Sequence, residues 1–550
     1  MTHTDTILQV KDLTIGFYVK GELVKAIDNV SFDVKRGETL AILGESGSGK
    51  SVSAASIMNL IDLPPGEILG GEVWFDGKNV FDMSRSERAR LNGKRIAMIF
   101  QDPLAHLNPV YSVGWQIAET FRAHHEVPED GAWAEAIRLL DKVGIPNPEE
   151  RARQYPHEFS GGQRQRIMIA MALALRPELL IADEPTTALD VTIQAQILRL
   201  LDSLQKEMGM SVIMITHDLK VAANVGDRLV VMYRGKVVET GNVKEVFENP
   251  QHSYTKRLFS AAAGPDGLNT DRRSKKANGE PLLSVRDLNK TYFLPGRGLF
   301  SKIKPINAIK GVNIDIVAGE TVGLVGESGS GKSTIAKLLM RLNEPTSGSA
   351  IYKGKDLFGM QGAELFAHRR NIQMIFQDPY ASLNPRMSVA DIVAEPWHIH
   401  PDLMPRERWE EEVGLLLEMV GLERDHARRY PHQFSGGQRQ RIAIARALAS
   451  KPELIICDEA VSALDVSIQS QIIDLLADLR DRIGLAYLFI THDLPVIRHF
   501  ADRIIVMKSG EIVEEGRADA IFEAPSHPYT KALLTAVPKP KWERAPVAAE

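Results

Sequence analysis

Hydrophobic and polar positions alternate in the same order in the two halves of the chain. In the first half, short apolar runs at 39–43, 179–182 and 212–215 predict buried strands of a parallel sheet. Between the last two strands, apolar residues recur with the period of a helix and define one face: Ile193, Ile197, Leu200, Leu201 and Leu204. The second half repeats the strands at 321–325, 454–457 and 487–490, and the helical face at Ile468, Ile472, Leu475, Leu476 and Leu479. The pattern therefore predicts two copies of one α/β domain.

Further segments around these strands complete the predicted domain. Alternating segments such as 7–10 and 30–34 predict a small antiparallel sheet, and the polar-rich regions 104–175 and 380–448 predict a helical subdomain. Turns at Arg234-Gly235 and at Ser509-Gly510 predict a closing hairpin in each copy. The fold class is therefore α/β, with two tandem domains that each combine a parallel-sheet core, an antiparallel β subdomain and an α-helical subdomain.

The spacing of the repeats sets the domain boundaries. Ser160 and Ser435 are 275 residues apart, whereas Gly44 and Gly326 are 282 apart, so the second copy carries a seven-residue insertion that we place at about 294–304. The segment 264–280 is polar and charged and lacks a hydrophobic period, which is typical of a linker. We therefore predict a first domain at 1–263, a linker at 264–280, a second domain at 281–537 and a loosely ordered tail at 538–550.

Composition narrows the function classes. The 550 residues include 44% hydrophobic and 25% charged residues, and the formal net charge of −5 gives no reason to expect nucleic-acid binding. Cys457 is the only cysteine, which excludes a disulfide framework and a cysteine-bound cluster within the chain. No apolar run approaches the ~18 residues that a membrane span needs.

The same eight residues, GESGSGKS, occur at 44–51 and at 326–333, each time between a predicted strand and a predicted helix. They fit G-x-x-x-x-G-K-[ST], in which backbone N–H groups and the helix N-terminus hold phosphate oxygens. One match by chance has a probability of roughly a few per cent, but two at equivalent places exclude chance. The predicted nucleotide-binding residues here are Gly44, Ser46, Gly47, Gly49, Lys50, Ser51, Val52, Gly326, Ser328, Gly329, Gly331, Lys332, Ser333 and Thr334.

Polar residues follow the buried strands next to this loop. Asp183 and Asp458 end a strand, where a carboxylate could hold Mg²⁺ through water; the alternative role is an N-cap of the following helix. Glu184 and Glu459 come directly after these aspartates and are candidates for the same site. The alternative is that each is an ordinary glutamate at the surface. A histidine after a buried strand, taken alone, is more often structural.

With these residues in place, a resemblance becomes clear. FQDP at 100–103 and 376–379 and FSGGQ at 159–163 and 434–438 join the phosphate loops and the Asp-Glu pairs in a fixed order. Each half resembles, almost end to end, the nucleotide-binding domain of an ATP-binding cassette (ABC) transporter. The resemblance implies ATP and Mg²⁺ as cofactors.

The resemblance also implies the role of each motif. Glu184 and Glu459 would polarise the attacking water, and His217 and His492 would contact the γ-phosphate. Gln101 and Gln377 would sense Mg²⁺, water and the transmembrane partner, so the implied metal-site residues are Ser51, Gln101, Asp183, Ser333, Gln377 and Asp458. Phe17 and Tyr292 match the aromatic residue that stacks on adenine, although aromatic residues in edge strands are usually packing residues.

The SGGQ segments imply shared sites. In the family this segment reaches across to the ATP of the partner domain, and its residues here are Ser160, Gly161, Gly162, Gln163, Ser435, Gly436, Gly437 and Gln438. The resemblance therefore implies two composite sites in one chain, one with Lys50, Asp183, Glu184 and His217 beside Ser435–Gln438, and the other with Lys332, Asp458, Glu459 and His492 beside Ser160–Gln163. Asp190 and Asp465 match the loop that couples the two sites.

Departures from the family pattern are few. Phe159 and Phe434 stand where the signature usually has leucine, Ala460 replaces the proline found at Pro185, and Val461-Ser462 replaces Thr186-Thr187. None of these changes removes a catalytic group, so we expect both sites to hydrolyse ATP.

The C-terminal part of each half points to a branch of the family. His252-Ser253-Tyr254-Thr255 and His527-Pro528-Tyr529-Thr530 are similar to the C-terminal region of the oligopeptide, dipeptide and nickel importer ATPases, as is Leu-Asn-Pro at 107–109 and 383–385. The resemblance implies peptide uptake powered at the cytoplasmic face of a bacterial inner membrane, with peripheral attachment. Its implied partners are two transmembrane permease subunits and an extracytoplasmic substrate-binding protein, with no nucleic acid.

Two functions other than import are alternatives for this sequence. A tandem ABC translation factor acting on the ribosome typically has a long, charged helical linker, but residues 264–280 are short and contain glycine and proline. A DNA-repair ATPase would need a long coiled-coil insertion, for which the sequence has no pattern. Co-purification with membrane proteins, ribosomes or DNA distinguishes the three.

Overall fold

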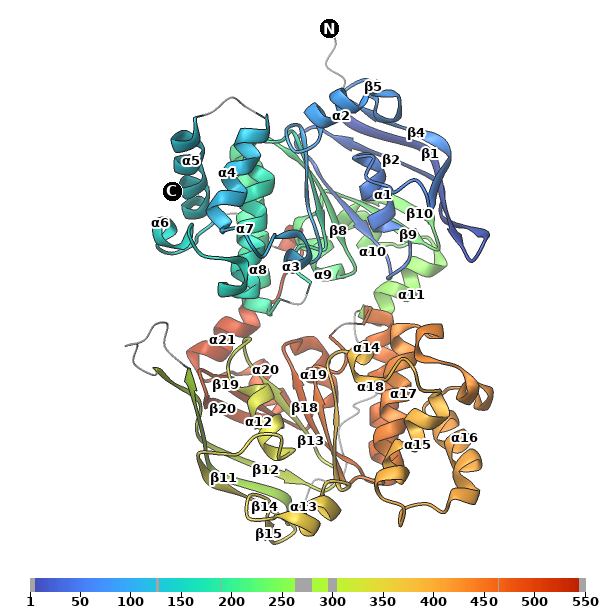
Figure 1. Cartoon of the computed structure of the whole chain (residues 1–550), viewed down its shortest axis with the longest axis vertical. Helices are drawn as coiled ribbons and strands as arrows, with labels where there is room; N and C mark the ends of the chain where they lie inside the picture. The colour runs from blue at the N-terminus through green and yellow to red at the C-terminus, as the bar shows by residue number, and fades with distance from the viewer. Residues whose placement is uncertain are drawn as a thin grey trace. The chain divides into compact units, whose positions relative to one another are not determined.

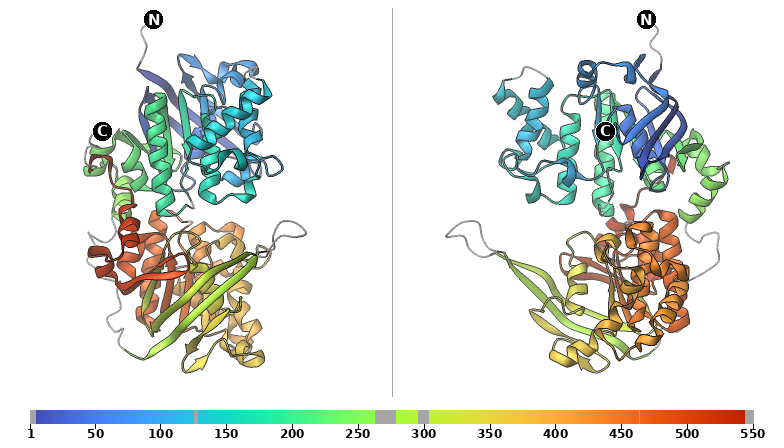
Figure 2. Two further views of the ribbon diagram at one scale, coloured as in Figure 1. Left: turned by 90° about the vertical axis from the view of Figure 1, so that its left-hand side faces the viewer. Right: turned by 45° about the vertical axis from the view of Figure 1, so that its right-hand side comes forward.

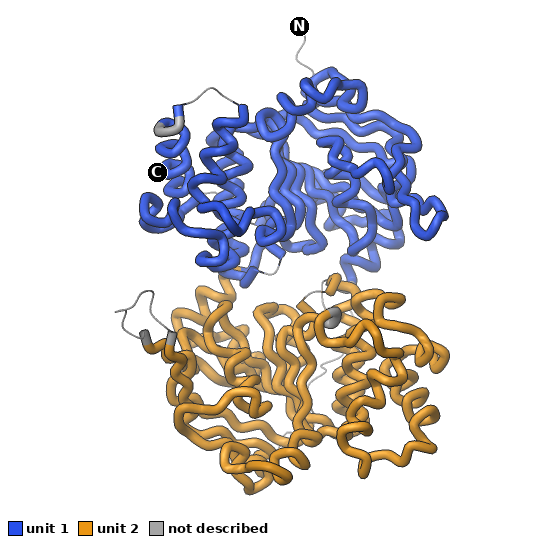
Figure 3. The backbone as a smooth tube through the Cα atoms, in the orientation of Figure 1, with its two compact units in different colours: residues 1–260, 537–550 blue, residues 261–536 orange. Residues whose placement is uncertain are grey.

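The chain folds into two compact units. The computed structural model describes residues 5–124, 128–187, 189–262, 279–294, 304–462 and 464–543. One unit consists of Met1–Ser260 with Val537–Glu550, and the other of Ala261–Ala536 (Figure 3). Almost all of the predicted linker at 264–280 and most of the predicted insertion at 294–304 lie outside the described residues.

The first unit begins with an antiparallel sheet (Figure 1). Its order is β2-β1-β4-β5, and its strands are β1 (Thr6–Val19), β2 (Glu22–Lys35), β4 (Gly66–Phe75) and β5 (Lys78–Asn79). The predicted antiparallel sheet is thus present, but β1 and β2 extend well beyond 7–10 and 30–34. Register shifts between Val10 and Leu13 and between Leu13 and Ile15 interrupt the alternation of buried and exposed residues. This interruption hid the full length of the strands from a pattern analysis.

A six-stranded sheet forms the core of the first unit. Its order is β10-β9-β3-β8-β7-β6, and only β10 runs antiparallel to its neighbour. The strands are β3 (Thr39–Leu43), β6 (Ile96–Ile99), β7 (Leu179–Asp183), β8 (Ser211–Thr216), β9 (Arg228–Tyr233) and β10 (Lys236–Asn242). The three strands predicted as buried, β3, β7 and β8, lie side by side, so their carboxyl ends share one edge of the sheet.

Alternate residues of the parallel strands face two different layers. Leu180 and Ala182 of β7 pack in one cluster with the helices, whereas Leu179 and Ile181 pack in another with the antiparallel sheet and α1. The helices are α1 (Lys50–Ile57), α2 (Arg85–Leu91), α3 (Pro103–His106), α4 (Val113–His124), α5 (Glu129–Lys142), α6 (Pro148–Arg151), α7 (Gly161–Leu173), α8 (Val191–Met208), α9 (Leu219–Val225), α10 (Val243–Glu248) and α11 (Ser253–Ala262). On α8, the predicted face is confirmed, because Ile197, Leu201 and Leu204 are buried and Ile193 and Leu200 pack against the same cluster.

The second unit repeats this architecture. Its antiparallel sheet has the order β12-β11-β14-β15 and its core sheet the order β16-β17-β18-β13-β19-β20. The strands are β11 (Pro281–Leu294), β12 (Lys304–Val317), β13 (Thr321–Val325), β14 (Ser347–Tyr352), β15 (Lys355–Asp356), β16 (Ile372–Ile375), β17 (Leu454–Asp458), β18 (Ala486–Thr491), β19 (Arg503–Lys508) and β20 (Glu511–Arg517). The helices are α12 (Lys332–Leu339), α13 (Gly362–His368), α14 (Pro379–Ser382), α15 (Val389–Ile399), α16 (Trp409–Met419), α17 (Gly436–Ala449), α18 (Val466–Ile483), α19 (Leu494–Phe500), α20 (Ala518–Glu523) and α21 (Pro528–Thr535). Figure 2 shows the long yellow-green strands of the antiparallel sheet and the orange helical part of this unit.

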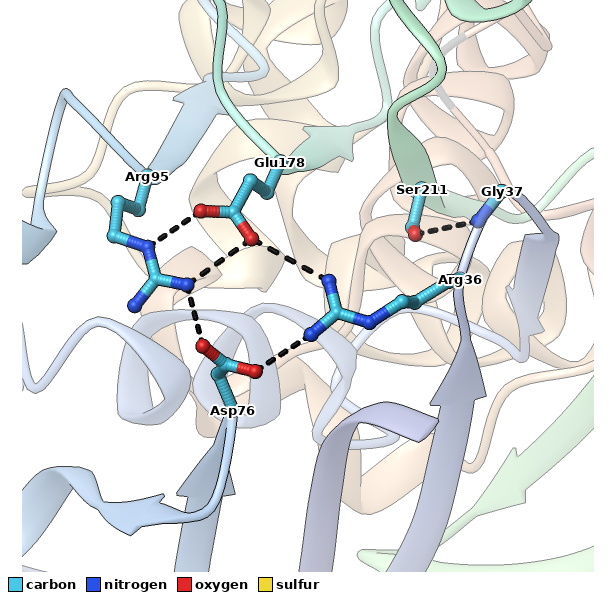
Figure 4. A network of polar contacts seen from close by, with 6 residues as sticks. All are labelled: Arg36, Gly37, Asp76, Arg95, Glu178 and Ser211. Atoms are coloured by element: carbon cyan, nitrogen blue, oxygen red, sulfur yellow. Dashed lines mark hydrogen bonds and ion pairs between the residues drawn. The ribbon is translucent and has the colours of Figure 1, made fainter. Parts of the chain in front are cut away.

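An ion-pair network joins the two sheets of the first unit (Figure 4). Arg36, at the end of β2, and Arg95, before β6, each contact both Asp76 and Glu178, with N–O distances between 2.5 and 3.4 Å. The hydrogen bond from Arg95 lowers the pKa of Asp76. In the second unit the equivalent Glu453 instead accepts hydrogen bonds from the Tyr352 hydroxyl at 2.5 Å and Lys353 Nζ at 2.6 Å. Both units therefore fix their antiparallel sheet to the start of the core strand that ends in Asp183 or Asp458.

The C-terminal segment packs within the first unit. Lys541 Nζ lies 2.5 Å from Asp227 Oδ1, and Asn224 Nδ2 donates to the Lys539 carbonyl at 2.8 Å. The Trp542 ring meets Phe247 of α10 edge-on at 5.7 Å. For residues 538–543 the structure thus differs from the loosely ordered tail that we expected, because an aromatic residue and a lysine in this short segment both find partners.

No helix among the described residues is long and apolar enough to cross a membrane.

Candidate functional site

The phosphate loop of the first unit sits tightly against the core sheet. A Cβ on Gly44 would lie 2.4 Å from the Met232 carbonyl oxygen of β9, so only glycine fits there. Gly47 and Gly49 have φ values of 76° and 99°, in the left-handed region that favours glycine. The Lys50 side chain is buried, and its Nζ donates to the carbonyl oxygens of Gly44 at 2.8 Å and Glu45 at 2.9 Å. The loop thus encloses a lysine ammonium at the N-terminus of α1.

The second unit builds the same loop. A Cβ on Gly326 would lie 2.3 Å from the Met507 carbonyl oxygen, and Gly329 and Gly331 have φ values of 79° and 110°. Lys332 Nζ donates to the carbonyl oxygens of Gly326 at 2.7 Å and Glu327 at 2.9 Å. A buried ammonium beside clustered backbone N–H groups is an arrangement suited to binding phosphate.

The carboxylate of Glu184 is the centre of the first candidate site. Gln101 Nε2 donates to Glu184 Oε2 at 2.9 Å, and His217 Nδ1 lies 3.1 Å from the same oxygen. Lys50 Nζ lies 4.0 Å from Glu184 Oε1. The structure therefore brings together four predicted site residues that come from the loops after β6, β7, β8 and β3.

The backbone of Glu184 is held in an uncommon conformation. Its φ is 47°, a left-handed value that costs a residue with a side chain roughly 1–2 kcal/mol. A hydrogen bond from its N–H to the Ile215 carbonyl at 3.0 Å fixes this conformation. Glu459 repeats both features, with a φ of 50° and a hydrogen bond to the Ile490 carbonyl at 3.0 Å. The same local strain in both units aims each carboxylate at its histidine and glutamine.

The surroundings keep Glu184 ionised. Burial pushes its pKa upward, but hydrogen bonds from His217 and Thr187 and the charges of His217 and Lys50 outweigh burial and lower the pKa below its ordinary value. A carboxylate that is ionised at neutral pH can accept a hydrogen bond from a water molecule and make that water more nucleophilic.

The second site shares these contacts. Gln377 Nε2 donates to Glu459 Oε2 at 2.7 Å, and His492 Nδ1 lies 3.3 Å from Glu459 Oε1. Burial alone would raise the pKa of Glu459. The hydrogen bond and charge of His492 outweigh burial, so the pKa of Glu459 is lowered overall. For His492, burial lowers the pKa, and the hydrogen bond and charge of Glu459 reverse this, so its pKa is raised.

One contact differs between the two sites, and it is not evident from the pattern of residues. Thr187 Oγ1 donates to the Glu184 carboxylate at 2.9 Å, whereas the equivalent Ser462 Oγ donates to the backbone carbonyl of Glu459 at 2.9 Å. In the sequence, Thr187 stands out only as a difference between the halves, where Ser462 replaces it. Its spacing, three residues after the glutamate, is the signal that could have indicated its role.

Asp183 and Asp458 fit the role of Mg²⁺ ligands. Burial raises the pKa of each, and each has a hydrogen bond from the loop serine, Ser51 or Ser333; Ser333 Oγ donates to Asp458 Oδ1 at 3.0 Å. Asp183 Oδ1 is buried and lacks a hydrogen-bond partner in the described part of the chain. Within that same part, no cluster of three or more His, Cys, Asp or Glu residues could hold a metal alone. A serine hydroxyl and a carboxylate beside a phosphate loop suit Mg²⁺, which binds one or two protein oxygens together with phosphate and water, and binding of the ion here stays a prediction.

The SGGQ segments form helix starts. Ser160 Oγ accepts from the Gln163 N–H at 3.3 Å and the Gln163 side chain accepts from the Ser160 N–H at 3.2 Å, a capping box for α7. Ser435 and Gln438 cap α17 in the same way. Among the described residues, these side chains bond within their own turn and not to the phosphate loop of the same unit. Their role at a nucleotide therefore stays a prediction.

The aromatic candidates are half-buried. Phe17 packs against the cluster below the antiparallel sheet. Tyr292 accepts a hydrogen bond from Asn343 Nδ2 at 2.9 Å, and Lys290 Nζ lies 4.9 Å from its ring centroid. Stacking on adenine stays a prediction for both residues.

Comparison with known proteins agrees with this geometry. A family described as "ABC transporter" matches residues 27–187 and 309–462, and one described as "Oligopeptide/dipeptide transporter, C-terminal region" matches residues 238–291 and 513–549. A "Glutathione import ATP-binding protein GsiA" of Escherichia coli (strain K12) is 48% identical over 570 residues, which cover 98% of this chain and 91% of the relative. The protein of the same name from Salmonella choleraesuis (strain SC-B67) gives the same figures.

Solved structures also match one half at a time. A dimeric structure of a post-hydrolysis state of the ATP-binding cassette MJ0796 bound to ADP and Pi is 34% identical, with a TM-score of 0.39, and the match covers 43% of this chain and 98% of that one. The structure of cbiO1 from Clostridium perfringens, part of the ABC transporter complex cbiONQ, is 31% identical with the same TM-score and covers 48% of this chain and 97% of that one. Because the family profile matches both halves and relatives align along nearly the whole chain, this protein belongs to the ABC transporter family, as an import ATPase of the oligopeptide/dipeptide branch with two fused nucleotide-binding domains.

Proposed function

We propose that this chain hydrolyses Mg²⁺-bound ATP at both of its sites and so powers the uptake of peptides through separate permease subunits. The observation that carries the proposal is the paired placement of Glu184 and Glu459. Each glutamate is ionised, held by a glutamine and a histidine, and close to a phosphate loop that holds a buried lysine.

The chemistry needs positioning and charge more than covalent help. In phosphoryl transfer, charge neutralisation and a placed base supply most of the rate, and the base contributes roughly 10²–10⁴-fold. Glu184 and Glu459 are the bases, Lys50 and Lys332 neutralise phosphate charge, and the serine and aspartate of each loop would hold Mg²⁺, which supplies further charge neutralisation when bound. Because Val461 and Ser462 leave these groups intact, we assign hydrolysis to both sites.

The completion of each site by the other half is part of the proposal. Ser435–Gln438 would act with Lys50 and Glu184, and Ser160–Gln163 with Lys332 and Glu459. In each segment a capped helix start presents N–H groups, which suits a phosphate oxygen. ATP bound by both partners of such a site would favour closing, and loss of ATP would favour opening.

The substrate class rests on relatives. The C-terminal matches at 238–291 and 513–549 belong to an oligopeptide/dipeptide family, and the relatives at 48% identity are named for glutathione import. Glutathione is itself a tripeptide, so we propose peptides as the class and glutathione as the first member to test. Two transmembrane permease subunits and an extracytoplasmic binding protein complete the proposed importer. This chain would sit on the cytoplasmic face of the bacterial inner membrane.

The test is uptake in cells that lack this chain. Labelled glutathione, a dipeptide and a pentapeptide are supplied separately, and the cells are complemented with the wild type or with a Lys50→Ala/Lys332→Ala double variant. We expect the wild type alone to restore uptake of at least one peptide and to sediment with membranes. Normal uptake of all three without the chain, or sedimentation with ribosomes, would contradict the proposal, and the second outcome would favour a translation factor.

A further inference from the structure

A tyrosine from the C-terminal part of each unit reaches the phosphate loop of the same unit. The Tyr254 hydroxyl, on α11, accepts a hydrogen bond from the backbone N–H of Glu45 at 3.3 Å. The Tyr529 hydroxyl, on α21, accepts one from the N–H of Glu327 at 3.1 Å. Each glutamate is the second residue of its loop, and the two contacts are separated along the chain by 209 and 202 residues. The repetition in both units shows that the contact belongs to the fold.

The tyrosine and the catalytic lysine hold the same peptide group from two sides. The peptide group between Gly44 and Glu45 gives its N–H to Tyr254, and its carbonyl oxygen, that of Gly44, accepts from Lys50 Nζ at 2.8 Å. In the second unit, the peptide group between Gly326 and Glu327 gives its N–H to Tyr529, and its carbonyl oxygen accepts from Lys332 Nζ at 2.7 Å. The position of the lysine ammonium therefore depends on a residue that the tyrosine fixes.

The ring of Tyr254 is well anchored. It is 4% exposed and stacks on Tyr233, at the end of β9, with ring centroids 4.1 Å apart. In the second unit, Lys508 Nζ lies 4.9 Å from the centroid of the Tyr529 ring. A buried and stacked ring has little freedom to move, so its hydroxyl is a fixed point for the loop.

A carboxylate and a histidine hold the start of each tyrosine helix. Glu239 of β10 accepts from the N–H groups of Gln251 and His252 at 2.7 and 3.0 Å, and His252 Nδ1 accepts from the Tyr254 N–H at 3.2 Å. We call Glu239, His252 and Tyr254 the first bracket.

The second unit has an equivalent second bracket, Glu514, His527 and Tyr529. Glu514 accepts from the N–H groups of Ser526 and His527 at 2.6 and 3.1 Å, and His527 Nδ1 accepts from the Tyr529 N–H at 3.1 Å. Burial would raise the pKa of Glu514, but hydrogen bonds from Thr530, Ser526 and His527 lower it to about 2. The carboxylate is thus ionised at any physiological pH, and each bracket links the edge hairpin to a phosphate loop.

We propose that Tyr254 and Tyr529 are positioning residues that fix the start of each phosphate loop and thereby set the affinity for ATP. The C-terminal extension is then part of the nucleotide site, acting on Lys50 and Lys332 through the Gly44–Glu45 and Gly326–Glu327 peptide groups. The inference goes beyond peptide uptake and holds for whichever solute is carried.

The test removes each hydroxyl and keeps its ring. Tyr254→Phe and Tyr529→Phe are made singly and together in the full chain, and the KM for ATP, kcat, the Kd of a fluorescent ATP analogue and Tm are measured. Loss of one hydrogen bond that organises a site corresponds to roughly a 3- to 10-fold change in an equilibrium constant. We expect the double variant to raise KM and Kd by about that factor, with kcat changed less than about twofold.

Tyr352→Phe is the matched control, because it also removes a hydroxyl that makes one hydrogen bond, here as a donor to Glu453, but this hydroxyl lies at the antiparallel sheet and not at a phosphate loop. It should lower Tm and leave KM unchanged. Hydrogen exchange supplies a second measurement, since the 44–50 peptide should lose protection in Tyr254→Phe. Unchanged KM and Kd in the double variant would overturn the proposal, as would a fall in Tm like that of the control without any change in nucleotide affinity.

Discussion

Replacing Gly162 with alanine tests whether close packing of α7 on α8 sets the position of the Ser160 turn. A Cβ on Gly162 would lie 2.6 Å from Ile193 Cγ2, well inside a normal carbon–carbon contact of roughly 3.5–4.0 Å. Gly161, the preceding residue of the same helix start, has room, since its Cβ would lie 3.7 Å from Leu189 Cδ2. The same substitution at neighbouring positions therefore separates packing from all other effects of adding a methyl group.

The size of the effect follows from two opposing terms. Forcing an extra methyl group into a packed contact costs about 1–3 kcal/mol, and alanine recovers up to about 1 kcal/mol of helix propensity relative to glycine. The propensity gain is shared by both variants, so their difference is the packing cost of about 1–3 kcal/mol. In a unit of this size, each kcal/mol shifts Tm by roughly 2–4 °C.

Differential scanning calorimetry on both single variants measures this difference. We expect Gly162→Ala to melt roughly 2–12 °C below Gly161→Ala in the transition of the first unit. Adding Ile193→Ala to Gly162→Ala removes the clashing methyl and should recover part of the loss, as a double-mutant coupling. Equal melting temperatures for the two glycine variants, or no recovery in the double variant, would refute the packing argument.

Three further predictions concern single groups. The pKa of Glu514 is held at about 2, below its ordinary 4.5, so its stabilising effect is complete above pH 4.5 and is lost as pH falls toward 2. The free energy of unfolding in urea should therefore depend less on pH across this range in Glu514→Gln than in the wild type. Identical pH profiles would contradict this. Thr187→Val removes a donor that lowers the pKa of Glu184, so the acid limb of the ATPase pH profile should move to higher pH, whereas Ser462→Ala should leave it in place. Trp542→Ala should destabilise the first unit by about 0.5–1.5 kcal/mol for the lost aromatic pair and so lower its melting temperature, and a change confined to the other unit would exclude the contact.

Local features were predictable from the sequence. The strand, loop and helix around Lys50 follow from an apolar run, a glycine pattern and a helical period that all lie within 20 residues of one another. The duplication gave each motif a second copy, which made chance matches improbable. The three buried parallel strands and the helical face of α8 also follow from local apolar patterns, and they were predicted at nearly their observed positions.

Contacts between distant segments were not predictable. Gln101 and Glu184 are 83 residues apart, and their hydrogen bond depends on the order of strands in the sheet, which periodicity does not encode. The contact of Tyr254 was not predictable because its partner is the backbone N–H of Glu45. Every residue except proline has this group, so the residue type at position 45 does not reveal the contact. The docking of Trp542 was missed because a short segment has too few apolar residues to show a period.

Glu184 and Glu459 are both assigned as bases for ATP hydrolysis. Phosphate release by Glu184→Gln, Glu459→Gln and the double variant tests this directly, with binding of a fluorescent ATP analogue as the control for an intact site. Since each site should lose roughly 10²-fold or more, we predict that each single variant loses the turnover of its own site and that the double variant falls to about 1% or less of the wild type, with ATP binding retained. Unchanged phosphate release in either single variant would show that its site is not hydrolytic and would contradict the account.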